Sequence, residues 1–193
     1  MRDLEIRGAG SMLGEIQSGH LEQVGYDTYC TLLDEVVKEM QGVEVEPEID
    51  IQIDLNVTSY IPDEYIPDSA QKIEVYQNIA LCKKEEDIQN VVDEIIDRFG
   101  NMPAELENLL DIARIKYLAK PFAISKIASK RTAVVFTFEQ SKYEIDLQKL
   151  LKVYGNRIKF SPGIKTMITL DIGTTNERQI LNDVTEFLKQ LSK

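Results

Sequence analysis

The stretch IQNVVDEIIDRFG (residues 88–100) predicts an amphipathic helix that ends at Gly100. Its apolar residues recur every three or four positions, the spacing that places them on one face of a helix. Gly100 follows the last of them, where glycine commonly ends a helix. The acidic residues between them, Asp93 and Glu94 included, should then lie on the face that contacts water. The apolar stripe consists of Ile88, Val91, Val92, Ile95, Ile96 and Phe99.

Helices are also predicted on both sides of this one. Before it, residues 70–81 have helical apolar spacing and follow Ser69, a residue that can cap the amino terminus of a helix. After it, Asn101 can cap a third helix, and Pro103 suits its first turn. Upstream, YIPDEYIPDS (60–69) repeats Ile-Pro-Asp and predicts a rigid surface turn, because proline fixes its own backbone angle and restricts the residue before it.

Strand patterns flank the helical block. Residues 49–57 alternate apolar and polar side chains, which is typical of a strand with one wet face. Later segments are rich in β-branched and aromatic residues, and Ser-Pro-Gly at 161–163 predicts the turn of a hairpin. A last amphipathic helix should begin after Asn176. The later strands are predicted at 122–128, 132–138, 143–147, 157–160 and 164–172, with a short helix near 147–153.

Helices and strands therefore occur in separate blocks, which favours an α+β fold with a mostly antiparallel sheet over a doubly wound parallel sheet. A glycine-rich loop and one amphipathic helix (26–41) precede these blocks. The sequence VEVEPE (43–48) is an acidic connector broken by Pro47. We accordingly predict two parts, a loop, helix and linker at 1–48 and an α+β domain at 49–193.

The 193-residue chain has a net charge of −11 that is unevenly distributed. Residues 43–113 carry 18 acidic and 4 basic side chains, whereas residues 114–165 carry 3 acidic and 12 basic ones. Either the molecule has two oppositely charged faces, or the two segments pack together and neutralise each other. No apolar run approaches the roughly 20 residues that span a bilayer, and the opening residues lack the apolar core of a secretory signal. We therefore expect a cytoplasmic protein without membrane contact.

The sequence gives little support for catalysis. Gly8, Gly10 and Gly14 are spaced one residue too widely for a dinucleotide-binding loop, and no Gly-Lys pair marks a phosphate-binding loop. VVDEII (91–96) is similar to a magnesium-binding DExx box, but its carboxylates belong to the polar face of a helix. His20 has no nucleophile or orienting carboxylate at a diagnostic spacing. We expect no catalytic residue, bound cofactor or metal in this chain.

The opening segment RDLEIRGAGSMLGEIQSGHLEQVGYDTYCTLLDEVV (2–37) resembles the region that follows the helicase core in bacterial transcription-repair coupling factors, the Mfd family. A shorter form of this pattern is shared with the RecG branch-migration translocases. YIPDEYIPD (60–68), EIIDRFG (94–100) and LLDIAR (109–114) also resemble the carboxyl-terminal domain of coupling factors, which RecG lacks. The resemblance covers most of the chain and weakens after about residue 125.

The resemblance implies that residues 1–48 are the end of the translocation (TRG) motif, which converts ATP-driven closure of two motor lobes into stepping on duplex DNA. Arg7 and Gln17 match the functional arginine and glutamine of this motif. Arginine can hold a carboxylate or phosphate with two hydrogen bonds, and a glutamine amide can change partners without a change of charge. In this interpretation ATP and Mg²⁺ bind to the motor of the parent protein and not to this chain.

The resemblance also implies that residues 49–193 form a non-catalytic regulatory domain. In the family this domain docks on the UvrB-like amino-terminal module of the same protein and covers the surface that recruits UvrA. The parent protein is an ATP-dependent DNA translocase that removes stalled RNA polymerase and recruits nucleotide excision repair. Glu94 and Asp97 match the family's docking contacts, and a spacing of three residues places them on one helix face.

The basic span 114–165 leaves a second function class open. Its cations are interleaved with aromatic residues, a composition that can bind nucleic acid through phosphate contacts and stacking. The domain would then be a nucleic-acid-binding accessory module. The alternative is that most of these rings pack in the core, since Phe136 and Phe138 alternate as inward-facing strand residues do.

Overall fold

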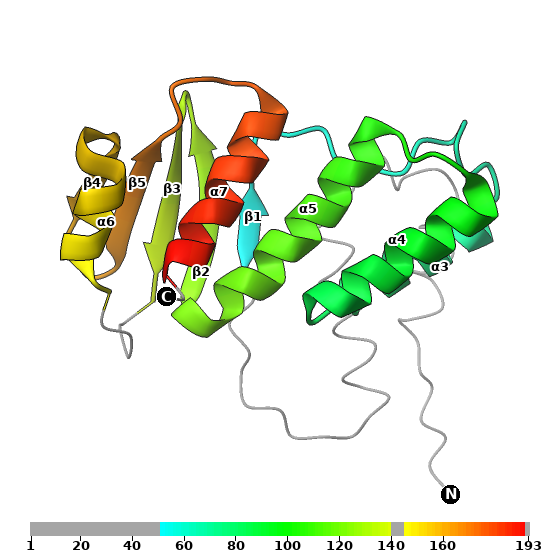
Figure 1. The fold of residues 1–193 in the computed structure, drawn as a ribbon, viewed down its shortest axis with the longest axis horizontal. Helices are drawn as coiled ribbons and strands as arrows, with labels where there is room; N and C mark the ends of the chain where they lie inside the picture. Colours follow the sequence, from blue (N-terminus) through cyan, green and yellow to red (C-terminus); the bar gives the residue numbers. More distant parts are fainter. Residues whose placement is uncertain (1–50, 140–144, 192–193) are drawn as a thin grey trace, which may run out of the picture.

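The computed structural model describes residues 51–139 and 145–191, which form an α+β domain (Figure 1). Its sheet has the strand order β1-β2-β3-β5-β4 and is antiparallel except for β1, which runs parallel to β2. The predicted fold class and the mostly antiparallel sheet are confirmed. The elements are β1 (Gln52–Asp54), α3 (Ser69–Ala80), α4 (Glu85–Phe99), α5 (Ala104–Ala119), η2 (Lys120–Phe122), β2 (Ile124–Lys130), β3 (Ala133–Phe138), α6 (Leu147–Tyr154), η3 (Gly155–Arg157), β4 (Ile158–Ser161), β5 (Thr166–Asp171) and α7 (Glu177–Leu191).

Helices α5, α6 and α7 cover one face of the sheet, as Figure 1 shows. Side chains alternate between the two faces of a strand, so Val134, Phe136 and Phe138 of β3 all point into the core beneath these helices. Phe136 packs on Phe187 of α7 with ring centroids 4.3 Å apart. We call this cluster the sheet core. The opposite face of the sheet carries the other half of each strand's residues, and in the described part of the chain no helix covers it.

Helix α5 belongs to two hydrophobic cores. Leu106 and Leu109 in its first half pack against α3 and α4 in what we call the helical core. Ile112 and Ile115 in its second half pack in the sheet core. In Figure 1, α5 accordingly runs between the sheet on one side and the α3–α4 pair on the other. The two halves of the domain are therefore held together by one continuous helix.

The Ile-Pro-Asp repeat is more deeply packed than a surface turn. Ile61 and Ile66 are 2% and 0% exposed and belong to the helical core. The backbone N–H groups of Tyr65 and Ile66 both donate to the carbonyl oxygen of Pro62 at 3.1 Å. The turn therefore exists as predicted, but it serves to bury the isoleucine that precedes each proline.

The amino-terminal caps of two helices differ from the predicted ones. Asp68, rather than Ser69, caps α3, because its Oδ1 accepts a hydrogen bond from the backbone N–H of Gln71 at 2.8 Å. Both residue types are good caps, but a carboxylate also interacts favourably with the positive end of the helix dipole. Pro103, rather than Asn101, occupies the cap position of α5. The predicted cap of the last helix, Asn176, is confirmed by its hydrogen bond from Gln179 N–H at 3.0 Å.

The strand predicted at 143–147 is wrong over the residues that the structure describes. Ile145 and Asp146 lie outside any strand, and α6 begins at Leu147. Asp146 is the N-cap, and its Oδ1 accepts from the backbone N–H of Lys149 at 3.0 Å. The cap satisfies a backbone donor that would otherwise be unpaired at the start of the helix, and it favours a helix that begins at Leu147 over a strand at that residue.

Candidate docking site on helix α4

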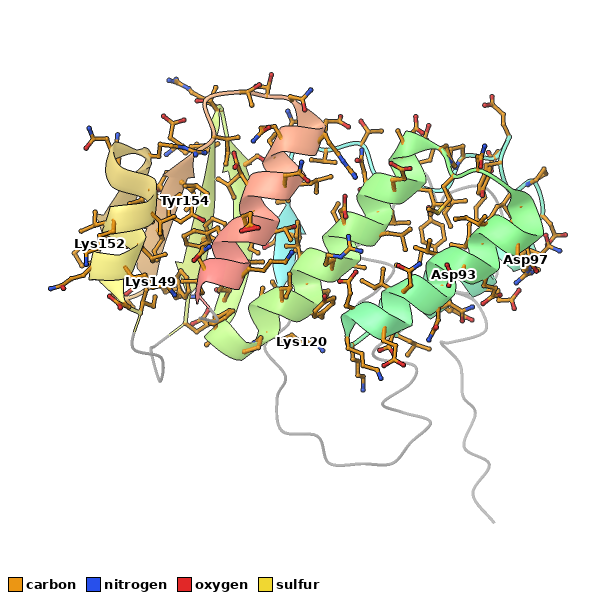
Figure 2. All side chains as sticks on the ribbon, in the orientation of Figure 1. Asp93, Asp97, Lys120, Lys149, Lys152 and Tyr154 are labelled. Atoms are coloured by element: carbon orange, nitrogen blue, oxygen red, sulfur yellow. The ribbon has the colours of Figure 1, made fainter. Side chains whose placement is uncertain are left out.

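Helix α4 exposes three acidic side chains in its carboxyl-terminal half, Asp93, Glu94 and Asp97, which we call the acidic ridge. On the opposite side of the helix Ile88 and Ile95 are fully buried in the helical core, and this burial fixes the rotation of α4 about its axis. Figure 2 shows Asp93 and Asp97 at the end of the molecule that lies away from the sheet. The polar face predicted for this helix is therefore confirmed, but Ile96, which was predicted on the apolar stripe, is 45% exposed.

Glu94 is held by an arginine within the domain. Its Oε1 accepts a hydrogen bond from Arg98 Nη1 at 2.7 Å, and Arg98 Nη2 donates to Oε2 of Glu74 on α3 at 3.2 Å. The guanidinium carbon also lies 5.0 Å from the centroid of the Phe99 ring, a cation–π arrangement. Glu94 thus shares one cation with Glu74, and part of its charge is compensated before any partner binds.

Asp93 and Asp97 lack such a cation. Asp93 accepts a hydrogen bond from the neutral amide of Gln89 at 2.9 Å. Within residues 51–139 and 145–191, Asp97 makes no hydrogen bond or ion pair. The two are four residues apart, about 40° around the helix, whereas Glu94 and Asp97 are about 60° apart. The structure therefore places both predicted docking residues on the surface and adds Asp93, whose signal in the sequence was its i,i+4 spacing from Asp97.

Two members of the acidic ridge, Asp93 and Asp97, work against the stability of their own helix. Asp97 lies in the last turn, where the partial negative charge of unpaired carbonyl groups repels a carboxylate. Asp93 and Asp97 also repel each other, at a cost of a few tenths of a kcal/mol for an exposed i,i+4 pair. Helix stability therefore does not account for the ridge, and a positively charged partner would relieve both repulsions.

Arg114 of α5 connects α4 to the rest of the domain. Its Nε and Nη2 donate to Oε2 and Oε1 of Glu85, both at 2.8 Å, and Tyr117 Oη donates to the same Glu85 carboxylate at 2.7 Å. Arg114 also pairs with Asp111, which in turn accepts from Arg178 Nη1 of α7 at 2.7 Å. This clamp, formed by Glu85, Arg114 and Asp111, fixes the start of α4 against α5 and α7.

The carboxylates of the clamp have opposite pKa shifts. The hydrogen bond from Arg114 lowers the pKa of Glu85, and the bond from Tyr117 acts in the same direction. Burial raises the pKa of Asp111, and the charges of Arg178 and Arg114 offset only part of this rise. Burial and the hydrogen bond to Glu85 raise the pKa of Tyr117 to about 12. At neutral pH the Glu85 and Asp111 carboxylates are therefore charged and the Tyr117 phenol is neutral, within a network that is partly removed from water.

Arg114→Met should destabilise the domain by about 1–3 kcal/mol at pH 7, because it removes charge-assisted hydrogen bonds from two carboxylates. Arg114 stabilises both carboxylates as anions, so its contribution is present at neutral pH and is lost as they are protonated. As the pH falls, the difference in the free energy of unfolding between wild type and variant should begin to shrink at the raised pKa of Asp111. It should vanish below the pKa of Glu85, which is lowered from the ordinary glutamate value of about 4.3. Urea unfolding from pH 7 to pH 3 measures it. A constant difference across this range would contradict the clamp.

The cations of the basic span 114–165 are divided between those that form ion pairs and those that do not. Arg114, Arg157 and Lys165 are in ion pairs with acidic side chains, and the Arg114–Glu85 pair is a point where the oppositely charged segments neutralise each other. Phe136 and Phe138 are buried, which confirms that these rings serve packing. The cations that remain on the uncovered face of the sheet are Lys126, Lys130, Arg131 and Lys159.

Three other residues singled out from the sequence, Arg7, Gln17 and His20, lie outside the described residues, and their roles stay predictions. Within the described part, no group of three or more His, Cys, Asp or Glu side chains is placed to hold a metal ion. None of the helices in that part combines the length and the apolar character needed to cross a membrane.

The comparisons with known proteins point to one family. The TRCF domain family matches residues 55–150. The transcription-repair-coupling factor of Bacillus subtilis (strain 168) is 36% identical over 197 residues, which cover 99% of this chain and 17% of that protein. Its counterpart in Staphylococcus epidermidis (strain RP62A) is 39% identical over 155 residues, which cover 79% of this chain and 13% of that protein. The chain thus spans less than a fifth of the length of these relatives.

One similar solved structure is a crystal structure of the C-terminal domain of a transcription-repair coupling factor. It superposes with a TM-score of 0.66 at 24% sequence identity, and the match covers 73% of this chain and 91% of that one. At this level of identity the likeness establishes the fold. The α+β architecture described above is therefore the architecture of that domain.

Proposed function

The chain belongs to the family of transcription-repair coupling factors and contains their TRCF domain, and from this premise we propose that the domain is an intramolecular latch. The acidic ridge of α4 docks on a basic surface of the UvrB-like amino-terminal module of the same protein. While docked, it masks the surface to which UvrA binds. The domain acts by binding and not by catalysis, within an ATP-dependent DNA translocase that removes stalled RNA polymerase and recruits nucleotide excision repair.

The uncompensated charge of Asp93 and Asp97 is the observation that carries this proposal. Asp97 lies in the last turn of the helix, where a carboxylate is unfavourable unless a cation approaches it, and Asp93 repels it at i,i+4 spacing. Among the described residues no cation pairs with either one. Ile96, which is 45% exposed, lies next to them on the helix surface and offers a single apolar contact. A charged ridge with little apolar area fits a partner that must be released again.

A weak interface suffices for a latch because both partners belong to one molecule. A flexible tether gives an effective concentration on the order of 1 mM. With a dissociation constant of about 0.1 mM for the separate modules, about ten molecules would be closed for each open one. Losing two docking charges at roughly 0.5–1 kcal/mol each would make the open form common. The open fraction, and with it the affinity for UvrA, would then rise about four- to eightfold.

Glu94→Gln with Asp97→Asn should therefore raise the affinity of the full-length protein for UvrA by about four- to eightfold, measured by a pull-down titration at low salt. The matched control is Glu64→Gln with Glu186→Gln, which removes the same charge from two exposed positions outside α4. Unchanged UvrA affinity in the α4 variant, or an equal increase in the control, would refute the latch.

For the segment before this domain we propose the role that its sequence implies. Residues 1–48 would form the end of the translocation motif, with Arg7 and Gln17 coupling closure of the motor lobes to movement on duplex DNA. ATP and Mg²⁺ would be bound by the motor. The support for this role is the resemblance of the segment and its match, within the 99% of the chain that aligns, to the Bacillus subtilis relative.

A further inference from the structure

The uncovered face of the sheet carries a groove whose lining includes four basic side chains. This face is turned away from the viewer in Figure 1, behind the strands that α5, α6 and α7 cover. The strand register places Lys130 of β2 opposite Ala133 of β3, and Ala133 opposite Asp171 of β5. On the same face Lys159 of β4 lies opposite Thr169 of β5. The resulting groove has a volume of about 460 Å³.

The cations lie along both edges of this groove. Lys130 and Arg131 come from the end of β2 and the hairpin that follows it, and Arg157 and Lys159 come from β4 and the residue before it. Three strand spacings separate β2 from β4, a distance of about 14 Å. A ligand that lies in the groove can therefore contact positive charge on two sides.

Most of this positive charge is uncompensated. In the described part of the chain Lys130, Arg131 and Lys159 have no ion pair. Arg157 donates to the backbone carbonyl of Asp171 at 2.9 Å and pairs with Asp183 at 3.1 Å. Asp171 is the one acidic residue in the lining.

Arg131, in the hairpin between β2 and β3, has a strained backbone conformation. Arg131 has a φ of +57°, in the left-handed region that hairpin turns of two residues normally fill with glycine or asparagine. Within the described residues, no hydrogen bond or ion pair of the Arg131 side chain explains why arginine occupies this position. Strained residues of this kind are concentrated at sites that bind ligands.

We propose that this groove binds the sugar–phosphate backbone of duplex DNA. The lining offers four basic side chains and the hydroxyls of Thr132, Ser161 and Thr169, the donors that commonly contact phosphate oxygens. It contains no aromatic ring, so it has no platform on which unpaired bases could stack.

An acidic peptide fits this groove less well. Peptides gain most of their binding free energy from a few large apolar anchors in pockets. The large exposed apolar side chain in the lining is Met167, and the rest of the floor is small or polar. Binding to a DNA backbone needs only cations and hydrogen-bond donors. This inference does not rest on the latch, because it concerns the sheet and not α4.

Titration of the 193-residue chain against a fluorescently labelled 20-base-pair duplex tests the proposal. With three phosphate contacts, the affinity should fall about fortyfold between 50 and 200 mM salt, given a slope of about −0.9 per contact. Lys130→Glu with Lys159→Glu should weaken binding at least about tenfold and reduce the slope by about 2. The matched control is Lys83→Glu with Lys152→Glu, the same change of charge at two exposed lysines outside the lining.

Arg131→Gly separates a binding role from a folding role. Glycine adopts a positive φ without strain, so the melting temperature should stay equal or rise while DNA affinity falls several-fold. Equal DNA affinity of the groove variant and its control would overturn the proposal. The proposal would also be overturned if the duplex does not bind to the wild-type chain while a glutamate-rich 20-residue peptide does, and if the groove variant loses that peptide binding.

Discussion

Leu109→Ala is expected to lower the free energy of unfolding of this chain by about 2–5 kcal/mol. Leu109 is 0% exposed and lies in the helical core, in the half of α5 that packs on α3 and α4. The substitution leaves a cavity that the neighbouring side chains fill only in part. Relaxation is further restricted because the second half of α5 is fixed in the sheet core. Urea unfolding followed by circular dichroism measures the loss.

Leu81→Ala is the matched control for this prediction. It removes the same atoms from a leucine that is 57% exposed at the carboxyl-terminal cap of α3. A surface substitution of this kind should change the free energy of unfolding by less than about 0.5 kcal/mol. Equal losses for the two variants would show that the helical core does not carry the stability assigned to it.

Asp93→Lys with Asp97→Lys should weaken docking on the amino-terminal module at least about tenfold, or 1.4 kcal/mol. Each substitution replaces an attraction with the repulsion of like charges at the same interface, which costs more than loss of the carboxylate alone. The helix itself should not suffer, because lysine near the carboxyl terminus interacts favourably with the helix dipole. The variant therefore separates docking from folding, and its midpoint of unfolding should equal or exceed that of wild type.

The local part of the candidate site could be predicted from the sequence. The apolar stripe of α4 and Gly100 at its end were sufficient to place Asp93, Glu94 and Asp97 on the solvent side, because helical periodicity is a local property. The approach of Glu74 to Arg98 could not be predicted in this way. It depends on how α3 packs on α4, and no spacing along the chain encodes that packing.

The sheet could be predicted only as a set of separate strands. Gln52 of β1 lies opposite Lys126 of β2, and pairing over such a separation is decided by tertiary packing. The basic groove was missed for the same reason, since Lys130 and Lys159 reach one face only through the register of four strands. The absence of the predicted strand at 145–147 has the opposite cause, because a local cap at Asp146 decided the structure there.

The most direct test of the latch mixes this chain with the separately prepared UvrB-like amino-terminal module and follows binding by isothermal titration calorimetry at low salt. The account predicts saturable binding to the wild-type chain, at least tenfold weaker binding of Asp93→Lys with Asp97→Lys, and no binding once UvrA occupies the module. Equal affinity of the two chains for the module, or simultaneous binding of chain and UvrA, would contradict it.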